Sequence, residues 1–216
     1  MILVPVKSLK NAKQRLAPLL TPAERVELAR AMLRDVSRAL AQAGQPVALV
    51  TSEPFALDLA QQHRFGVIED REEHGETAAI ELATRVAQER GAEWTLVVPG
   101  DAPLLTAAEI AKILSAAPPS GMAIAPDWRW RGSNAVWRRP ANLIPLRFGD
   151  DSFLPHVRNA AATGKPVAVL ELPGLAVDVD RPADVEQLLA RAVTTQAQQL
   201  LAEWDVRERL RSLAAD

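Results

Sequence analysis

The chain has 216 residues, 48% of them hydrophobic and 24% charged, which suits one packed α/β domain with an ordinary charged surface. A formal net charge of −2 argues against a protein that coats nucleic acid or an anionic membrane, yet it leaves room for a local basic pocket that binds a small anion. Cysteine is absent, which excludes disulfides and thiolate sites. No apolar run approaches the roughly 20 residues that span a bilayer, and no signal peptide is evident, so we expect a cytoplasmic protein.

Short apolar runs alternate with longer amphipathic stretches along the chain. The apolar runs predict strands at 1–6, 46–51, 66–69, 95–98, 122–125, 135–137 and 167–171. The amphipathic stretches, two of which begin with Thr as N-cap and Glu three residues later, predict helices at 22–40, 56–63, 77–90, 106–116 and 182–192. This alternation predicts an α/β fold in three layers, a mostly parallel sheet with helices on both faces.

The last part of the chain reads as a helical tail. We therefore expect a main domain at 1–190 and a C-terminal helical tail at 191–216. Leu200, Leu201 and Trp204 in the tail are spaced for packing, either on the main domain or on a partner chain. A homodimer is thus one of two open alternatives.

A basic stretch follows the first predicted strand. Lys7, Lys10, Lys13 and Arg15 fall within nine residues that contain no glycine. A backbone cradle for phosphate needs glycines, but Lys and Arg side chains can bind phosphate oxygens instead through charge-assisted hydrogen bonds. In a parallel sheet, ligands bind beyond the carboxyl ends of the strands, which is where this stretch lies. The alternative is a solvated basic loop.

Three acidic residues are candidates for a metal site. Asp101 follows the strand at 95–98, and Asp178 and Asp180 alternate with Val177 and Val179, so both acids point the same way on an extended segment. Paired carboxylates are costly without a cation, and Mg²⁺ prefers oxygen ligands and can bridge to phosphates. The alternative for Asp101, a helix cap, is weakened because Thr106 already fits that role.

Two polar turns could bind a small acid. Gly132-Ser133-Asn134 and the stretch from Gly149 to Ser152 offer small hydrogen-bonding groups, with arginines close in sequence. Such a mixture can bind a carboxylate or a phosphate. We expect the neighbouring tryptophans to pack in the core or at an interface, and His156 to be buried and hydrogen-bonded.

Several stretches occur in a recognisable order: VPVK followed by AKQRL, then AMLRDV, VVPGDAPLL, APD before GSNA, FGDDSF with a following His, and PGLAVDVDRPADV. From Ile2 to about Leu189 the chain resembles the 2-phospho-L-lactate guanylyltransferase family of coenzyme F-420 biosynthesis. This family is similar to the molybdenum-cofactor guanylyltransferases. The resemblance implies a Rossmann-like nucleotidyltransferase fold of the nucleotide-diphospho-sugar transferase type.

The resemblance also implies a reaction, in which the phosphate of a three-carbon phospho-acid attacks the α-phosphate of GTP and pyrophosphate leaves. The acceptor in this family is 2-phospho-L-lactate, phosphoenolpyruvate or 3-phosphoglycerate. Lys13 and Asp101 would be catalytic. The resemblance places nucleotide contacts at Val6, Lys7, Lys13, Arg15, Thr51, Gly75 and Glu76, acceptor contacts at Asn134, Gly149 and Ser152, and Mg²⁺ at Asp101, Asp178 and Asp180.

The chain departs from the family pattern at two places. Glu76-Thr77 stands where the family has Leu-Asn beside the nucleoside, so guanine is implied by resemblance alone, and Glu76 could accept hydrogen bonds from a guanine edge or face solvent. A segment with two tryptophans and two arginines, 128–131, replaces a glycine-rich turn, which suggests a changed and more acidic acceptor.

Two alternatives to this function stay open. One is a related transferase that uses CTP or another acceptor, and the other is a non-catalytic nucleotide-binding relative. The joint presence of Lys13, Asp101, Asp178 and Asp180 favours an enzyme, because this combination is hard to explain in a protein that only binds its ligand.

Overall fold

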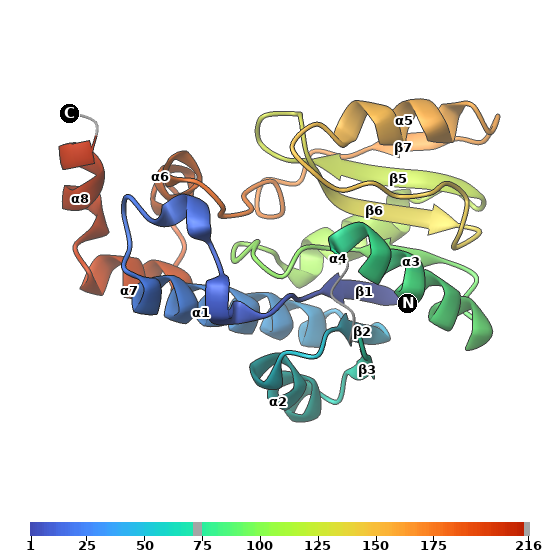
Figure 1. Ribbon diagram of the computed structural model, residues 1–216. Coiled ribbons are helices and arrows are strands. Elements are labelled where there is room, and N and C mark those ends of the chain that lie inside the picture. Colours follow the sequence, from blue (N-terminus) through green and yellow to red (C-terminus); the bar gives the residue numbers. More distant parts are fainter. Residues whose placement is uncertain (71–74, 214–216) are drawn as a thin grey trace.

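The computed structural model describes residues 1–70 and 75–213, which form a sheet of seven strands in the order β3-β2-β1-β4-β6-β5-β7 (Figure 1). All pairs are parallel except those of β6, which runs antiparallel to both β4 and β5. The predicted mostly parallel sheet is confirmed. The strands are β1 (Ile2–Pro5), β2 (Val47–Val50), β3 (Gly66–Ile68), β4 (Thr95–Val97), β5 (Gly121–Pro126), β6 (Ser133–Arg139) and β7 (Val167–Val169).

The helices lie close to their predicted positions, with one addition in the middle of the chain. Both predicted capping boxes are present, Thr21 with Glu24 and Thr106 with Glu109. A helix that the sequence did not predict, α5, follows the polar turn that ends at Ser152. The helices are α1 (Pro22–Gln42), α2 (Pro54–His63), α3 (Glu76–Glu89), α4 (Ala107–Ala116), α5 (Phe153–Ala161), α6 (Pro182–Leu189), α7 (Gln196–Glu203) and α8 (Val206–Leu213).

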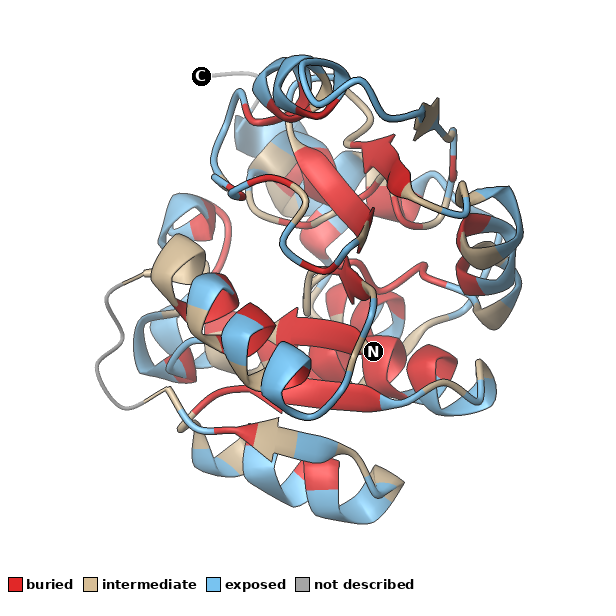
Figure 2. Ribbon diagram, turned by 90° about the vertical axis from the view of Figure 1, so that its right-hand side faces the viewer, coloured by how far each residue is buried: buried red, intermediate tan, exposed pale blue. Residues whose placement is uncertain are grey.

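Helices cover both faces of the sheet, as predicted. Side chains alternate along each strand, so Ile2 and Val4 pack with α1, α2 and α4 on one face, while Leu3 packs with α3 and α5 on the other. Figure 2 shows most strands in the buried colour between helices whose outer sides are exposed, whereas the edge strands β3 and β7 are more exposed. The sheet is therefore the middle of three layers and carries most of the core.

The C-terminal helices pack against the main domain. Leu201 of α7 and Val206 and Leu210 of α8 are buried in one cluster with Leu28 and Met32 of α1. Figure 1 shows α7 lying along one end of α1. The predicted tail is thus helical up to 213, and its last three residues lie outside the described part of the chain. Of the helices in the described ranges, none combines the length and apolar character needed to cross a bilayer.

Candidate functional site

A cleft of about 910 Å³ opens where β1, β4 and β5 end, at the carboxyl edge of the sheet. This is the edge at which ligands bind in open α/β sheets. Segments that lie far apart in sequence meet there, because the loops after all three strands leave the sheet on the same side. Twelve of the thirteen residues predicted for the site line this cleft: Val6, Lys7, Lys13, Arg15, Gly75, Glu76, Asp101, Asn134, Gly149, Ser152, Asp178 and Asp180.

Thr51 is the one predicted site residue that the structure places outside the lining of the cleft. Its side chain is buried, and it is not among the described residues that line the cleft. Its hydroxyl accepts a hydrogen bond from the backbone N–H of Glu53, at 2.9 Å, just before α2 begins. The hydroxyl of Thr51 is thus engaged in shaping the start of a helix, away from the site.

Lys13 occupies the centre of the acidic side of the cleft. It separates two short 3-10 turns, Leu9–Asn11 and Gln14–Leu16, and its backbone is left-handed at φ 54°. The ammonium donates a hydrogen bond to Asp101 and lies 3.9 Å from Asp180 Oδ1, with only 10% of the side chain exposed. Burial alone would lower the pKa of Lys13, but the nearby carboxylates outweigh it and raise that pKa. Lys13 is therefore a firmly charged cation at the rim of the sheet.

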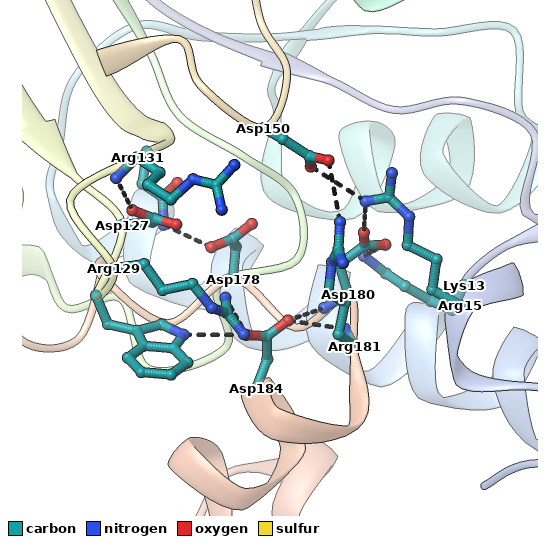
Figure 3. Close-up of polar contacts among 12 residues, drawn as sticks. Lys13, Arg15, Asp127, Arg129, Arg131, Asp150, Asp178, Asp180, Arg181 and Asp184 are labelled. Carbon is teal, nitrogen blue, oxygen red and sulfur yellow. Dashed lines mark hydrogen bonds and ion pairs between the residues drawn. The ribbon is translucent and has the colours of Figure 1, made fainter. Parts of the chain in front are cut away.

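The three predicted acids approach one another through backbone pairing. The N–H of Val179 donates to the carbonyl of Asp101 at 3.0 Å, which lays the segment with Asp178 and Asp180 beside the loop after β4. Val177 and Val179 are fully buried, so the alternating acids face the cleft as the sequence pattern indicated. Asp180 pairs with Arg15 at 2.7 Å (Figure 3).

Asp178 has an unusual environment. Its Oδ1 accepts a hydrogen bond from the Asn134 side chain at 2.9 Å. Burial, followed by the negative charge of Asp101, raises the pKa of Asp178 to about 7. Two facing carboxylates that disfavour each other's charge call for a nearby cation.

We tested whether this acid set fits a divalent metal. The oxygen donors of Asp101 and Asp178 have the right chemistry for Mg²⁺, and a cation would relieve the repulsion that raises the pKa of Asp178. Between Asp101 and Asp180, the cation present is the ammonium of Lys13. Over the ranges that the structure describes, no three acidic or histidine side chains are grouped closely enough to form a metal site by themselves. The residues fit a metal whose remaining ligands come from phosphate or water.

The opposite wall of the cleft is built on β6 and the start of α5. The Ser152 hydroxyl accepts from the Ser133 N–H at 3.0 Å, and Gly149 has φ 147°, a conformation that favours glycine. His156 Nε2 accepts from the Arg147 N–H at 2.9 Å, so Nδ1 carries the proton and donates to the Ser133 hydroxyl. Burial, and then the charge of Arg138, lower the pKa of His156 to about 4. The predicted buried, hydrogen-bonded histidine is confirmed, and it is neutral.

The two arginines of the segment 128–131 line the cleft, but each has an acidic partner. Arg129 pairs with Asp184 at 2.7 Å and stacks on the Trp128 ring at 4.0 Å from its centroid. Arg131 makes two hydrogen bonds to Asp151, at 2.7 and 3.0 Å. Both positive charges are thus at least partly balanced within the protein, and the changed, more acidic acceptor stays a prediction.

Glu76 begins α3 and lies among the charged groups of the cleft. Burial, and then the charge of Asp101, raise the pKa of Glu76, whereas Lys7 and Lys13 lower it. Of the two alternatives for Glu76, a solvent-facing position does not agree with this environment. The side chain lies near the cations that were predicted to hold the triphosphate.

Asp184 is a site residue whose contacts the sequence did not reveal. An acid in the first turn of a helix ordinarily serves only to favour the helix dipole. In the structure its side chain is buried and accepts from four donors, two on its own helix start and two on the segment 128–131. Asp184 lies three residues after Arg181, which is the spacing of a capping box, and this spacing could have predicted the contacts with the helix start.

Comparison with known proteins identifies the family. A family model described as CofC, guanylyl transferase CofC like, matches residues 1–211. Phosphoenolpyruvate guanylyltransferases of Sphaerobacter thermophilus and Rubrobacter xylanophilus are 39% and 40% identical over 191 and 190 residues, covering 88% and 87% of this chain and 92% of each relative. The 2-phospho-L-lactate guanylyltransferase of Methanothermobacter thermautotrophicus is 31% identical over 199 residues, which cover 92% of this chain and 88% of that protein.

Solved structures agree with this assignment at the level of fold. A Desulfovibrio desulfuricans G20 protein classed with the nucleotide-diphospho-sugar transferases superposes with a TM-score of 0.79 at 18% identity, covering 98% of this chain and 96% of that one. A nucleotidyl transferase from Methanothermobacter gives a TM-score of 0.57 at 16% identity, with 87% and 95% coverage. The predicted nucleotidyltransferase fold is confirmed. Because the family model spans nearly the whole chain and several relatives exceed 30% identity over most of it, the chain belongs to the CofC-like guanylyl transferase family.

Proposed function

We propose that this enzyme transfers GMP from GTP to the phosphate of a small phospho-acid and releases pyrophosphate, with Mg²⁺ as cofactor. The names of the relatives support guanylyl transfer, and phosphoenolpyruvate is the first acceptor to test because the relatives at 39% and 40% identity are named for it. The product, a guanylylated phospho-acid, fits a role in coenzyme F-420 biosynthesis, which the family resemblance implies.

The observation that carries this proposal is the pairing of Lys13 with the acids at the carboxyl edge of the sheet. Lys13 and Arg15 come from the loop after β1, and both contact acids that lie more than 80 residues away in sequence. Cations of this kind bind triphosphate oxygens, and carboxylates beside them bind the metal that accompanies a nucleotide. A cleft with both sets suits two anionic substrates that must be brought together.

The chemistry requires positioning and charge stabilisation. A phosphate oxygen of the acceptor forms a bond to the α-phosphorus of GTP, and the bond from that phosphorus to the bridging oxygen of pyrophosphate breaks. No general base is needed, because the attacking oxygen is already ionised near neutral pH. Lys13 and Arg15 would hold the triphosphate and stabilise the charge that develops on it, while Asn134 and Ser152 would orient the acceptor. Bound at Asp101 and Asp178, with Asp180 nearby, Mg²⁺ would neutralise phosphate charge.

The test is pyrophosphate release by the purified protein with each of four nucleoside triphosphates and a panel of phospho-acids, with and without Mg²⁺. We expect turnover with GTP and phosphoenolpyruvate, lost without the metal. Asp101→Asn should cut turnover sharply while leaving the thermal unfolding midpoint nearly unchanged. Turnover with CTP in place of GTP would support the alternative of a different nucleotide. Tight nucleotide binding with no turnover on any acceptor would support the non-catalytic alternative.

A further inference from the structure

Asp184 joins two loops that line the cleft. Its Oδ2 accepts from the backbone N–H groups of Asp180 and Arg181, at 3.1 and 2.7 Å. Its Oδ1 accepts from the Trp128 indole N–H at 3.0 Å and from Arg129 at 2.7 Å. Figure 3 shows the carboxylate between the indole and guanidinium on one side and the start of α6 on the other. Each oxygen therefore serves a different loop.

These two loops carry different parts of the site. One, residues 178–181, presents Asp178 and Asp180 to the phosphate side of the cleft. The other, residues 127–132, leads directly into Asn134 of β6. The backbone N–H of Trp128 also donates to the carbonyl of Ala176 at 2.9 Å, so the loops run alongside each other. Asp184 adds a charged connection at the point where both loops face the cleft.

The burial of Asp184 indicates that its side chain does more than cap α6. The residue is 2% exposed, and a buried carboxylate is tolerated only where donors satisfy its oxygens. A cap for α6 needs only the two backbone donors. The indole and guanidinium contacts come from a segment 55 and 56 residues away, and an exposed capping acid would serve the helix equally well. The burial and the extra donors point to a second role besides capping.

We propose that Asp184 is a positioning residue that holds the loop 127–132 in register with the loop that carries Asp178 and Asp180. This inference rests on the proposed function and adds a residue that sets the separation between the acceptor and the triphosphate. Reactions between two bound groups are sensitive to this separation, since a displacement of about 1 Å can cost roughly 100-fold in rate. Asp184 touches neither substrate in this role and acts through its two neighbours.

Two variants separate the connection from the cap. In Asp184→Asn, the amide oxygen can still accept from the two backbone N–H groups, whereas the amide nitrogen cannot accept from Trp128 or Arg129. Trp128→Phe removes the indole donor and changes the ring on which Arg129 stacks, while the helix start and the pair of Arg129 with Asp184 can remain. Asp151→Asn is the matched control, because it breaks the exposed pair with Arg131 near the same loop and Asp151 does not line the cleft.

The first readout is amide hydrogen exchange, which does not depend on turnover. We expect Trp128→Phe to speed exchange in the peptide covering 177–185, on the far side of Asp184, and Asp184→Asn to speed exchange at both 127–132 and 177–185. Asp151→Asn should leave 177–185 unchanged. Unaltered exchange at 127–132 in Asp184→Asn, where both contacts with that loop are lost, would overturn the connection, and this holds whether or not the wild-type protein turns over any substrate.

The second readout is steady-state kinetics with GTP and the acceptor found in the panel assay. We expect Asp184→Asn and Trp128→Phe to lower kcat by about 10- to 100-fold with little change in the KM for GTP, because alignment is lost and nucleotide binding is not. The double variant should be no worse than Asp184→Asn alone, since both changes break the same connection. Additive losses, or losses that simply follow the thermal midpoint, would show that Asp184 has only a structural role.

Discussion

Replacing Lys13 with methionine tests the central contact of the site. Methionine keeps most of the buried aliphatic volume and removes the charge. Two unit charges about 4 Å apart interact by roughly 4 kcal/mol at an effective dielectric constant of 20, and Lys13 lies 3.9 Å from Asp180 Oδ1 with a side chain only 10% exposed. A phosphate oxygen bound at similar range would lose a comparable interaction. We therefore expect kcat/KM for GTP to fall by about 100- to 1,000-fold, as for the loss of one charge-stabilising donor.

The same variant should shift the pH dependence of the reaction. The charge of Lys13 lowers the pKa of Asp178, which burial and Asp101 nevertheless raise to about 7. Without Lys13 this pKa rises further, so Asp178 stays protonated to higher pH. If ionised Asp178 is needed for metal binding, the acid limb of kcat/KM, which reports the free enzyme, moves to higher pH in Lys13→Met.

The assay is pyrophosphate release between pH 5.5 and 9, with Lys10→Met as the matched control. Lys10 is an exposed lysine of the same loop and is not among the described residues that line the cleft. The control should keep wild-type kcat/KM and the wild-type pH profile. The reasoning fails if Lys13→Met stays within threefold of wild type, or if its acid limb moves to lower pH.

Three further predictions concern stability. Asp178→Asn should stabilise the metal-free protein above pH 7 by a few kcal/mol, at about 1.4 kcal/mol per pKa unit, and should have little effect below pH 4. The reason is that the pKa of Asp178 is raised to about 7, so the folded wild type loses stability as the pH rises from about 4 to about 7. Urea unfolding at several pH values would measure this difference. His156→Gln should remove a pH dependence of stability that has the opposite sign. Because the pKa of His156 is lowered to about 4, its contribution to folding stability is complete above pH 6.5 and is lost as the pH falls toward 4. The same urea unfolding measurement should show a loss of up to about 3 kcal/mol in the wild type and little in the variant. Truncation after Ala190 removes the buried side chains of Leu201, Val206 and Leu210. At roughly 1.5 to 3 kcal/mol per large side chain, it should lower the thermal unfolding midpoint by about 10 °C or more. An unchanged midpoint would show that 191–216 is a tail independent of the main domain at 1–190.

The sequence predicted the sheet and most helices because their signals are local. Apolar runs set the strands, and Thr21 and Thr106 marked helix starts through capping boxes that the structure contains. The direction of β6 could not be predicted, since a short apolar strand reads alike in either direction. Helix α5 was missed because Pro155 and the preceding Gly-Asp-Asp-Ser stretch are typical of a turn, although proline is tolerated in the first turn of a helix.

The site residues likewise include some that the sequence could predict and others that it could not. Lys13 and the acids could be predicted because each follows a strand that ends at one edge of the sheet, so the topology brings them together. Thr51 also follows a strand, but alternation decides which way such a side chain points, and here it points to the start of α2. The contacts of Asp184 with Trp128 and Arg129 depend on a tertiary approach that no local pattern encodes.

With the proposed substrates, the charges of the cleft would favour the entry of a cation and an anion together. Asp180 is paired with Arg15, and Asp150 with Arg15 and Arg181 (Figure 3). Asp101 is paired with Lys13. A triphosphate that entered without a metal and took Lys13 and Arg15 as partners would leave Asp101 and Asp180 without their cations, close to Asp178. The negative charge of Asp101 already helps to raise the pKa of Asp178, so this arrangement would be unfavourable. A divalent cation that entered with the triphosphate would remove this cost, because the freed carboxylates would bind the metal while the freed cations bound phosphate. On the proposed function, the ion pairs within the protein would therefore favour the metal complex of the nucleotide over the free nucleotide. The selection would come from an exchange of partners at Lys13 and Arg15, without any change in the net charge of the chain.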